Sequence, residues 1–146
     1  MEDFMRQAME LAALAGTNGD VPVGCVIVKD GAVIGRGYNR REEDCDAVAH
    51  AEVEAIREAC RHLGSWRLSG CALVVTLEPC PMCAGAIIQS RLDAVYYGAQ
   101  DEKGGACGSV LNLFEERFNH KPRLYGGILG ADCAAQLQDF FGALRI

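Results

Sequence analysis

The chain has 146 residues, half of them hydrophobic and 23% charged, which fits one domain with a buried core and excludes an intrinsically disordered chain. Its net charge of −6 excludes a protein that coats nucleic acid nonspecifically, although a local basic patch could still bind a small folded element of a nucleic acid. No apolar run approaches the roughly 20 residues needed to span a membrane.

The first half of the chain predicts a helix, a hairpin and a second helix. Residues 3–15 carry apolar side chains at helical spacing, and this start lacks the pattern of an export signal, so we expect a cytoplasmic protein. Residues 21–39 predict two strands joined at Asp30-Gly31, a dipeptide typical of tight hairpin turns. Residues 49–64 predict a helix. The apolar face of this helix is expected to hold Ala49, Val53, Ile56 and Cys60.

The second half of the chain alternates strands with helices. Residues 71–77 form a continuous apolar run, which predicts a central strand covered on both faces. The helix that follows has Pro81 in its first turn, where proline is favoured. The remaining expected elements are this helix over 81–91, a strand over 93–99, a glycine-rich loop over 104–109, a strand over 123–129 and a helix over 131–145. This alternation predicts one α/β layered domain over residues 1–146, with parallel strand pairs added to the antiparallel hairpin.

Eight cysteines are many for this length, but only one pair has informative spacing. Cys80 and Cys83 lie three positions apart in the segment TLEPCPMCAG. Such a pair can serve as a thiol redox couple, in a structural zinc site or in a catalytic zinc site. The other cysteines have no pairing pattern, and most of them are expected to be reduced, buried, small hydrophobic residues. They are Cys25, Cys45, Cys60, Cys71, Cys107 and Cys133.

His50 and Glu52, in the segment AHAE, favour the catalytic zinc site. A structural site of four cysteines needs a second closely spaced pair, which the sequence lacks. His50 at one helix start could join Cys80 and Cys83 at another, because positions i and i+3 share a helix face and helix N-termini favour thiolates. Three protein ligands leave a fourth position for water, as in catalytic zinc sites. Glu52 would then carry protons between that water, a ring nitrogen and a leaving amine.

The pattern H-x-E followed by P-C-x-x-C is the signature of zinc-dependent base deaminases, and it occurs here at residues 50–52 and 79–83. Within that superfamily the chain resembles the bacterial tRNA-specific adenosine deaminases, which convert the wobble adenosine of an anticodon to inosine. The resemblance runs from about Val21 to Arg145. It rests on the segments VPVGCVIV, GRGYNR, AHAEVEAI, VTLEPCPMCAGAIIQSR, DEKGGACGS, FNH and DFF.

This resemblance implies a three-layer α/β/α cytidine-deaminase-like fold with a mixed central sheet of about five strands. It implies one Zn²⁺ per chain, bound by His50, Cys80 and Cys83, with Glu52 as the catalytic proton shuttle and no organic cofactor. It also implies a homodimer that binds a tRNA anticodon stem-loop, with both subunits contributing to the RNA-binding surface.

Four further positions match segments that contact the substrate in this family. Asn39, in GYNR, is expected to contact the substrate, and Val23 is expected to form part of the pocket wall. Asp101 and Ser109 lie in a loop that resembles the one lining the path of the flanking nucleotides. These four residues are therefore the expected substrate-binding set.

Other features fit either RNA binding or an ordinary surface. Basic residues gather in GRGYNRR and ERFNHKPR, as RNA contacts or as solvated loop charges. Phe140 and Phe141 match an aromatic pair near the anticodon loop, although packing within the helix is expected for at least one of them. Residues Ala47-Val48 replace the usual Pro-Thr, Arg41 replaces a common proline and Cys107 replaces a small residue. These departures concern the expected RNA groove and leave the zinc motif intact.

Two alternative functions compete with the tRNA enzyme. Guanine or other free-base deaminases share AHAEVEAIREACR and EPCPMC, whereas the region from GGACGS to NLFEERFNH resembles the tRNA enzymes. The more distant alternative is a thiol redox protein or a noncatalytic zinc protein that uses the Cys80–Cys83 pair. Zinc content separates a thiol redox protein from a deaminase, and the substrate separates a free-base deaminase from the tRNA enzyme.

Overall fold

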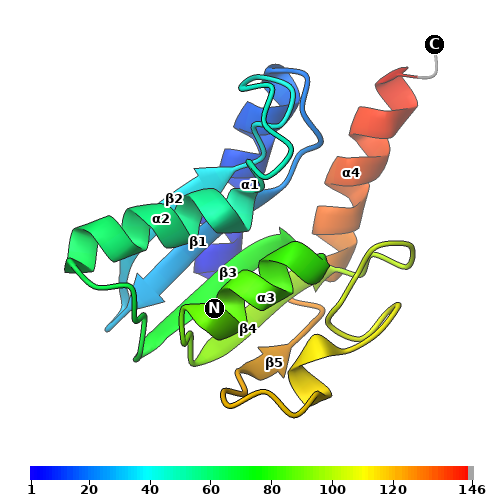
Figure 1. Ribbon diagram of the computed structural model, residues 1–146. Coiled ribbons are helices and arrows are strands. Elements are labelled where there is room, and N and C mark those ends of the chain that lie inside the picture. The colour runs from blue at the N-terminus through cyan, green and yellow to red at the C-terminus, as the bar shows by residue number, and fades with distance from the viewer. Residues whose placement is uncertain (145–146) are drawn as a thin grey trace.

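The computed structural model describes residues 1–144 (Figure 1). In chain order the elements are α1 (Glu2–Thr17), β1 (Gly24–Lys29), β2 (Ala32–Tyr38), α2 (Ala51–Leu63), β3 (Cys71–Leu77), α3 (Pro81–Gln89), β4 (Ala94–Ala99), the 3₁₀ turn η1 (Leu113–Glu115), β5 (Arg123–Tyr125) and α4 (Gly130–Leu144). Every helix and strand predicted above is present, and Arg145, the last residue of the predicted closing helix, lies outside the described residues. Within residues 1–144, no helix combines the length and apolar character of a membrane span.

The strands form one mixed sheet in the order β2-β1-β3-β4-β5. β1 pairs antiparallel with β2 and β3, and β4 pairs parallel with β3 and β5. The β1–β2 connection is the predicted hairpin, in which Asp30 and Gly31 have φ values of 50° and 78°. These left-handed values are what a two-residue type I′ turn requires. The central position of β3 explains its nearly continuous burial and confirms the prediction for residues 71–77.

Alternate side chains of the sheet face two separate helical layers, as the two-residue repeat of a strand dictates. Cys25 and Ile27 of β1 lie in a core that includes α2 and α3, whereas Val26 and Val28 lie in a core that includes α1 and α4. Figure 1 shows α2 and α3 in front of the sheet and α1 and α4 behind it. The predicted three-layer α/β/α fold is confirmed.

The close packing of α2 on β2 corrects the apolar face predicted for this helix. A Cβ atom at Gly37 would lie 2.2 Å from the carbonyl oxygen of Ala51, and one at Gly35 would lie 2.4 Å from that of Ala55. The helix therefore approaches the strand so closely that its small residues face the sheet, while Val53, Ile56 and Cys60 are only partly buried. The buried residues of α2 are Ala51, Glu52, Ala55 and Ala59. This contact fixes the end of α2 that carries His50.

The last strand is shorter than its apolar sequence predicted. The expected strand over 123–129 ends at Tyr125, because two glycines turn the chain away from the sheet. Gly127 has a φ of 84°, outside the extended region, and a Cβ atom at Gly126 would lie 2.4 Å from the ring of Tyr97. The chain therefore leaves β5 early and reaches α4 through a turn.

The six scattered cysteines largely have the predicted burial. Cys25, Cys71, Cys107 and Cys133 are buried, and Cys60 is partly buried. Cys45 is the exception, since it is exposed in a turn where its φ is 50°. The described cysteines are all free thiols.

Candidate zinc site

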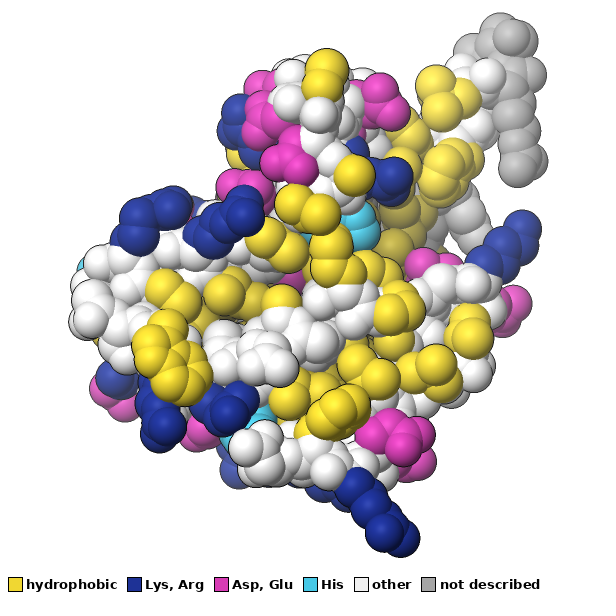
Figure 2. Space-filling view, viewed as in Figure 1, with side chains coloured by type: hydrophobic (Ala, Val, Ile, Leu, Met, Phe, Trp, Pro, Cys, Tyr) yellow, Lys and Arg dark blue, Asp and Glu magenta, His cyan; other side chains and the backbone are white. Residues whose placement is uncertain are grey.

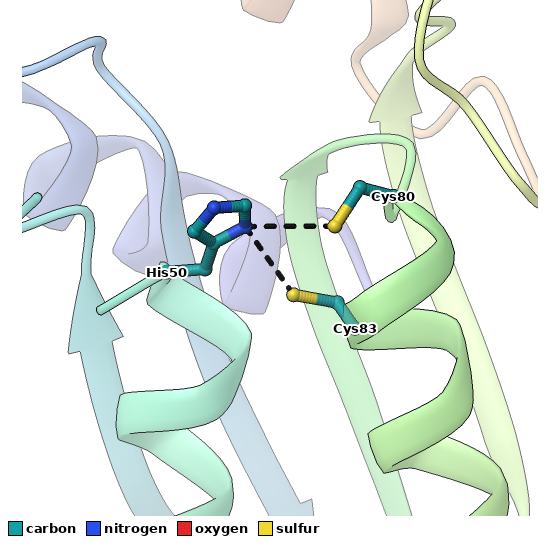
Figure 3. Close-up of side chains that lie close together, drawn as sticks. All are labelled: His50, Cys80 and Cys83. Atoms are coloured by element: carbon teal, nitrogen blue, oxygen red, sulfur yellow. Dashed lines mark hydrogen bonds between the residues drawn. The ribbon is translucent and has the colours of Figure 1, made fainter. Parts of the chain in front are cut away.

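The starts of α2 and α3 lie side by side and carry His50, Cys80 and Cys83 (Figure 3). His50 is the N-cap residue of α2, and Cys80 is the N-cap residue of α3, directly before Pro81. Both caps have extended backbone, so their side chains leave the helix axis and face one another across the gap between the helices. Cys83, three positions after Cys80, points into the same gap. The structure thus brings the three predicted ligand residues together.

The distances among these side chains fit a tetrahedral zinc ion. The Nδ1 atom of His50 lies 3.6 Å from the Sγ atom of Cys80 and 3.5 Å from that of Cys83, and the three ligand atoms lie within 4.8 Å of one another. Zinc–sulfur bonds of about 2.3 Å and zinc–nitrogen bonds of about 2.05 Å at a tetrahedral angle separate nitrogen from sulfur by about 3.6 Å. Two thiolates and an imidazole are also donors that zinc prefers. The residues present therefore fit the ion.

Hydrogen bonds within the cluster separate the pKa values of its side chains. A hydrogen bond from Cys83 lowers the pKa of Cys80 to about 4, and one from His50 contributes in the same direction. The bond to Cys80 and burial raise the pKa of the Cys83 thiol far above its usual range. The bond to Cys80 also raises the pKa of His50. A divalent cation must displace protons from Cys83 and His50, so binding of such an ion is coupled to proton release.

Glu52 lies in the first turn of α2 and is only 4% exposed. Burial raises the pKa of its carboxyl from 4.5 to about 7, and the negative charge of Cys80 adds to this effect. A carboxyl group with a pKa near neutrality can both accept and donate a proton at physiological pH, as general acid–base catalysis requires. Glu52 lines the same cavity as His50 and Cys80. The helix end thus allows two residues at positions i and i+2 to reach one site.

A cavity of about 210 Å³ opens beside the cluster. This is below the roughly 300 Å³ at which pockets for drug-sized ligands begin, and it suits one base-sized group. Of the predicted substrate contacts, Val23, Asn39 and Asp101 line the cavity. Ser109 is placed differently, because its hydroxyl and its backbone N–H both donate to Glu78. The other lining residues are Val21, Arg41, His50, Ala51, Glu52, Leu77, Glu78 and Cys80.

Asn39 is held in place by its own loop. It is 7% exposed, and its side-chain amide donates to the carbonyl oxygen of Val21 at 3.3 Å. Its side-chain oxygen accepts a hydrogen bond from the backbone N–H of Arg41, also at 3.3 Å. An asparagine amide has two N–H donors and two acceptor lone pairs, so one of each remains available. Asn39 therefore offers a fixed polar group to the cavity.

Glu78 is a lining residue that the sequence reasoning missed. It is 2% exposed, and its carboxylate accepts hydrogen bonds from the loop after β4. The signal available in the sequence was its position, directly between a buried apolar strand and Cys80. A charged side chain at such a place must find buried polar partners.

One arginine of the first predicted basic patch, Arg40, is paired with acidic neighbours. Arg40 lies 3.0 Å from Asp44 and 3.5 Å from Glu43, and it also donates to the hydroxyl of Tyr38. Arg41, by contrast, is exposed and lines the cavity. Of these two arginines, only Arg41 has its charge at the mouth of the site.

The two phenylalanines of α4 differ in their surroundings. Phe140 is partly buried, and its ring meets that of Phe141 edge to face at a centroid distance of 5.4 Å. Phe141 is 42% exposed and lines a neighbouring groove of about 550 Å³. This groove shares Val21, Leu77 and Asp101 with the cavity. Phe141 thus lies on the surface that continues outward from the site.

Comparisons with known proteins agree with this geometry. A model of the cytidine and deoxycytidylate deaminase zinc-binding region matches residues 1–99. The chain is 48% identical over 145 residues to a tRNA-specific adenosine deaminase of Bacillus subtilis (strain 168), covering 99% of this chain and 90% of that protein. A solved structure from work on A-to-I editing by tRNA A34 deaminases has a TM-score of 0.90 and 46% identity, with 93% of this chain and 99% of that chain covered. A guanine deaminase from Bacillus subtilis has a TM-score of 0.67 and 38% identity, with 85% and 82% covered.

Proposed function

The chain belongs to the cytidine and deoxycytidylate deaminase family, and we propose that it hydrolyses adenosine to inosine at the wobble position of a tRNA anticodon. The observation that carries this proposal is the 48% identity, over nearly the whole chain, to an enzyme named for tRNA adenosine deamination. The guanine deaminase is less similar in both sequence and fold. The cavity beside the His-Cys-Cys cluster has room for a single base, which agrees with this reaction.

His50, Cys80 and Cys83 would hold one zinc ion per chain. The nitrogen–sulfur distances of 3.5 and 3.6 Å support this assignment, and so does the position of both cysteines at the electropositive start of α3. When bound, zinc lowers the pKa of a water molecule toward about 7 and so supplies a nucleophile at neutral pH. Two of these residues, His50 and Cys80, line the cavity, so the ion would lie at its wall.

Glu52 would move the protons of the reaction. Deamination consumes one water and releases ammonia, so both protons of the water must leave its oxygen, one for the ring nitrogen and one for the departing amine. The Glu52 carboxyl lines the cavity beside His50 and Cys80, where it can accept the first proton and return it to the base. Asn39 would hold the base beside Glu52 through the N–H donor and the acceptor lone pair that its side-chain amide has available. Val23 would hold it through an apolar contact. All three side chains are buried, so a base bound in the cavity would shield the transfer from bulk water.

We also propose that the enzyme is a homodimer. Large apolar side chains are exposed on α3 and in the segment between β4 and β5, and Figure 2 shows apolar surface across this face. Exposed apolar patches of this kind mark association sites. The residues are Met82, Val110, Leu111 and Phe118. Light scattering should give twice the chain mass of 15.7 kDa, and a monomer at micromolar concentration would contradict the dimer. A cytoplasmic location and a single deaminase domain over residues 1–146 stay predictions.

The decisive experiment compares two substrates under identical conditions. The zinc-loaded enzyme is incubated with an anticodon stem-loop that carries wobble adenosine and, separately, with guanine, and ammonia and inosine are measured. We expect inosine in the stem-loop and no ammonia from guanine. The matched control is a stem-loop with guanosine at the wobble position, which should remain unchanged. Ammonia released from guanine alone would replace the proposed substrate by the free base.

A further inference from the structure

Glu78 is a buried carboxylate that neither the metal cluster nor the proton transfer uses. Among the described residues it has no cationic partner. Its two oxygens instead accept backbone N–H groups from Asp101 at 3.2 Å, Cys107 at 3.0 Å and Ser109 at 3.1 Å, and the hydroxyl of Ser109 donates a fourth hydrogen bond. All four donors come from the loop over residues 101–109. One carboxylate therefore anchors both ends of this loop.

The loop is wrapped closely around this side chain. A Cβ atom at Gly105 would lie 2.2 Å from the Oε2 atom of Glu78, so a larger residue there would displace the carboxylate or the loop. The backbone N–H of Ala106 also donates to the carbonyl oxygen of Pro79 at 2.8 Å. The loop is thus docked directly on the segment that connects β3 to the first cysteine of the cluster.

The chemistry of the four donors calls for an anion at this position. Three of them are backbone N–H groups that can only donate, and a carboxylate offers them two acceptor oxygens. A glutamine at position 78 would replace one carboxylate oxygen by an N–H₂ group, which cannot accept a hydrogen bond. At least one backbone N–H of the loop would then lack an acceptor. Alanine would leave all four donors without their partner. The loop should therefore loosen in a graded way across the two substitutions.

The anchored loop forms part of the wall of the candidate site. Asp101 lines both the cavity of about 210 Å³ and the adjoining groove of about 550 Å³, and Glu102 and Lys103 line the groove. The side chain of Asp101 is itself occupied by the backbone N–H groups of Lys103 and Gly104. The loop therefore acts as one preformed unit at the junction where a base would enter and its neighbouring nucleotides would lie.

We propose that Glu78 is a positioning residue that fixes the 101–109 loop as the substrate-binding wall of the site. It acts on binding of the nucleic acid through the loop, and it leaves the metal ligands and Glu52 to perform the chemistry. This role rests on the proposed tRNA function for the identity of the substrate, but the anchoring of the loop does not depend on it.

The test uses the zinc-loaded full chain with Glu78→Gln and Glu78→Ala, and with Glu116→Gln as an exposed, isosteric control. Three quantities are measured for each protein: zinc per chain, hydrogen exchange of the amides of Asp101, Cys107 and Ser109, and KM and kcat on the stem-loop. We expect zinc to be retained and amide protection to fall in the order wild type, Gln, Ala. KM of the alanine variant should rise about tenfold or more, and each tenfold rise corresponds to about 1.4 kcal/mol. Its kcat should stay within about threefold of the wild-type value. The control should match the wild type.

Ser109→Ala keeps the test decisive if Glu78→Ala does not fold. It removes one of the four donors and leaves the carboxylate, so a smaller loss of amide protection and a smaller rise in KM are expected. Full amide protection in the Glu78 variants would overturn the proposal, and so would loss of zinc or a fall in kcat at unchanged KM. A wild-type enzyme that is inactive on the stem-loop refutes the proposed tRNA function instead, because the exchange measurement needs no substrate.

Discussion

Glu52→Gln should stabilise the zinc-free protein in a strongly pH-dependent way. Burial raises the pKa of this carboxyl from 4.5 to about 7, and at about 1.4 kcal/mol per pKa unit this shift corresponds to about 3 kcal/mol. Below pH 4.5 the carboxyl is protonated in both the folded and the unfolded state, so its full contribution to stability is present. As pH rises toward and through 7, the unfolded state gains from ionising and the folded state loses stability. Glutamine, which stays neutral, does not undergo this loss.

The assay is urea unfolding of reduced, chelator-treated protein from pH 5 to pH 8.5. We expect an advantage for Glu52→Gln of less than about 1 kcal/mol at pH 5, which grows to about 3 kcal/mol at pH 8. Glu58→Gln, an exposed position on the same helix, is the matched control and should show no such trend. A difference between wild type and Glu52→Gln that does not change with pH would refute the assignment of a buried, proton-binding carboxyl. With zinc bound, the same variant should keep the metal and lose turnover.

The remaining predictions concern the metal cluster and the packing of the helices. Cys83→Ser should lower zinc affinity, measured by competition with a chromophoric chelator, while the control Cys45→Ser should not. The zinc affinity of the wild type should rise from pH 6 to pH 8, because the side chains of Cys83 and His50 have raised pKa values and must lose a proton to bind the ion. Equal affinities at the two pH values would contradict the proton release. Gly37→Ala should destabilise the fold by several kcal/mol, on the order of an overpacked core, because its Cβ would collide with the backbone of α2. Gly85→Ala, where nothing lies within 4 Å, should instead stabilise α3 by about 1 kcal/mol in chemical unfolding.

The order of the elements and the metal cluster could be predicted because their signals are local. Asp30-Gly31 specifies a turn through its own backbone preferences, and the apolar run of β3 indicates a strand buried on both faces. The cluster followed from two short motifs, each at a helix start, and the structure brings His50 together with Cys80 and Cys83 as expected. In each case the residues that carry the signal are also the residues that form the feature.

What could not be predicted depends on partners far away in the chain. The buried face of α2 is set by glycines in β2, because the helix packs so closely on them that only small residues such as alanine fit between helix and strand. The helical repeat of apolar residues in the sequence had instead indicated larger side chains on this face. Glu78 acquires its role from a loop that begins 23 residues later, and no helical or strand repeat links the two. The placement of Ser109 follows from the same contact, because its hydroxyl is taken by Glu78. Such features become visible only when the tertiary neighbours are known.

The tight contact between α2 and β2 also governs how the protein can exchange its metal. Backbone packing at Gly37 and Ala51 locates His50, and the strand-to-helix junction of β3 and α3 locates the two cysteines. Packing between the helices and the sheet therefore positions the three candidate ligand residues, whereas the fold of a zinc finger forms only with its metal. We therefore expect that a spectroscopically visible ion such as cobalt(II) can replace zinc while the three layers stay assembled. The ligand field of such an ion would report directly on the site that the scaffold maintains.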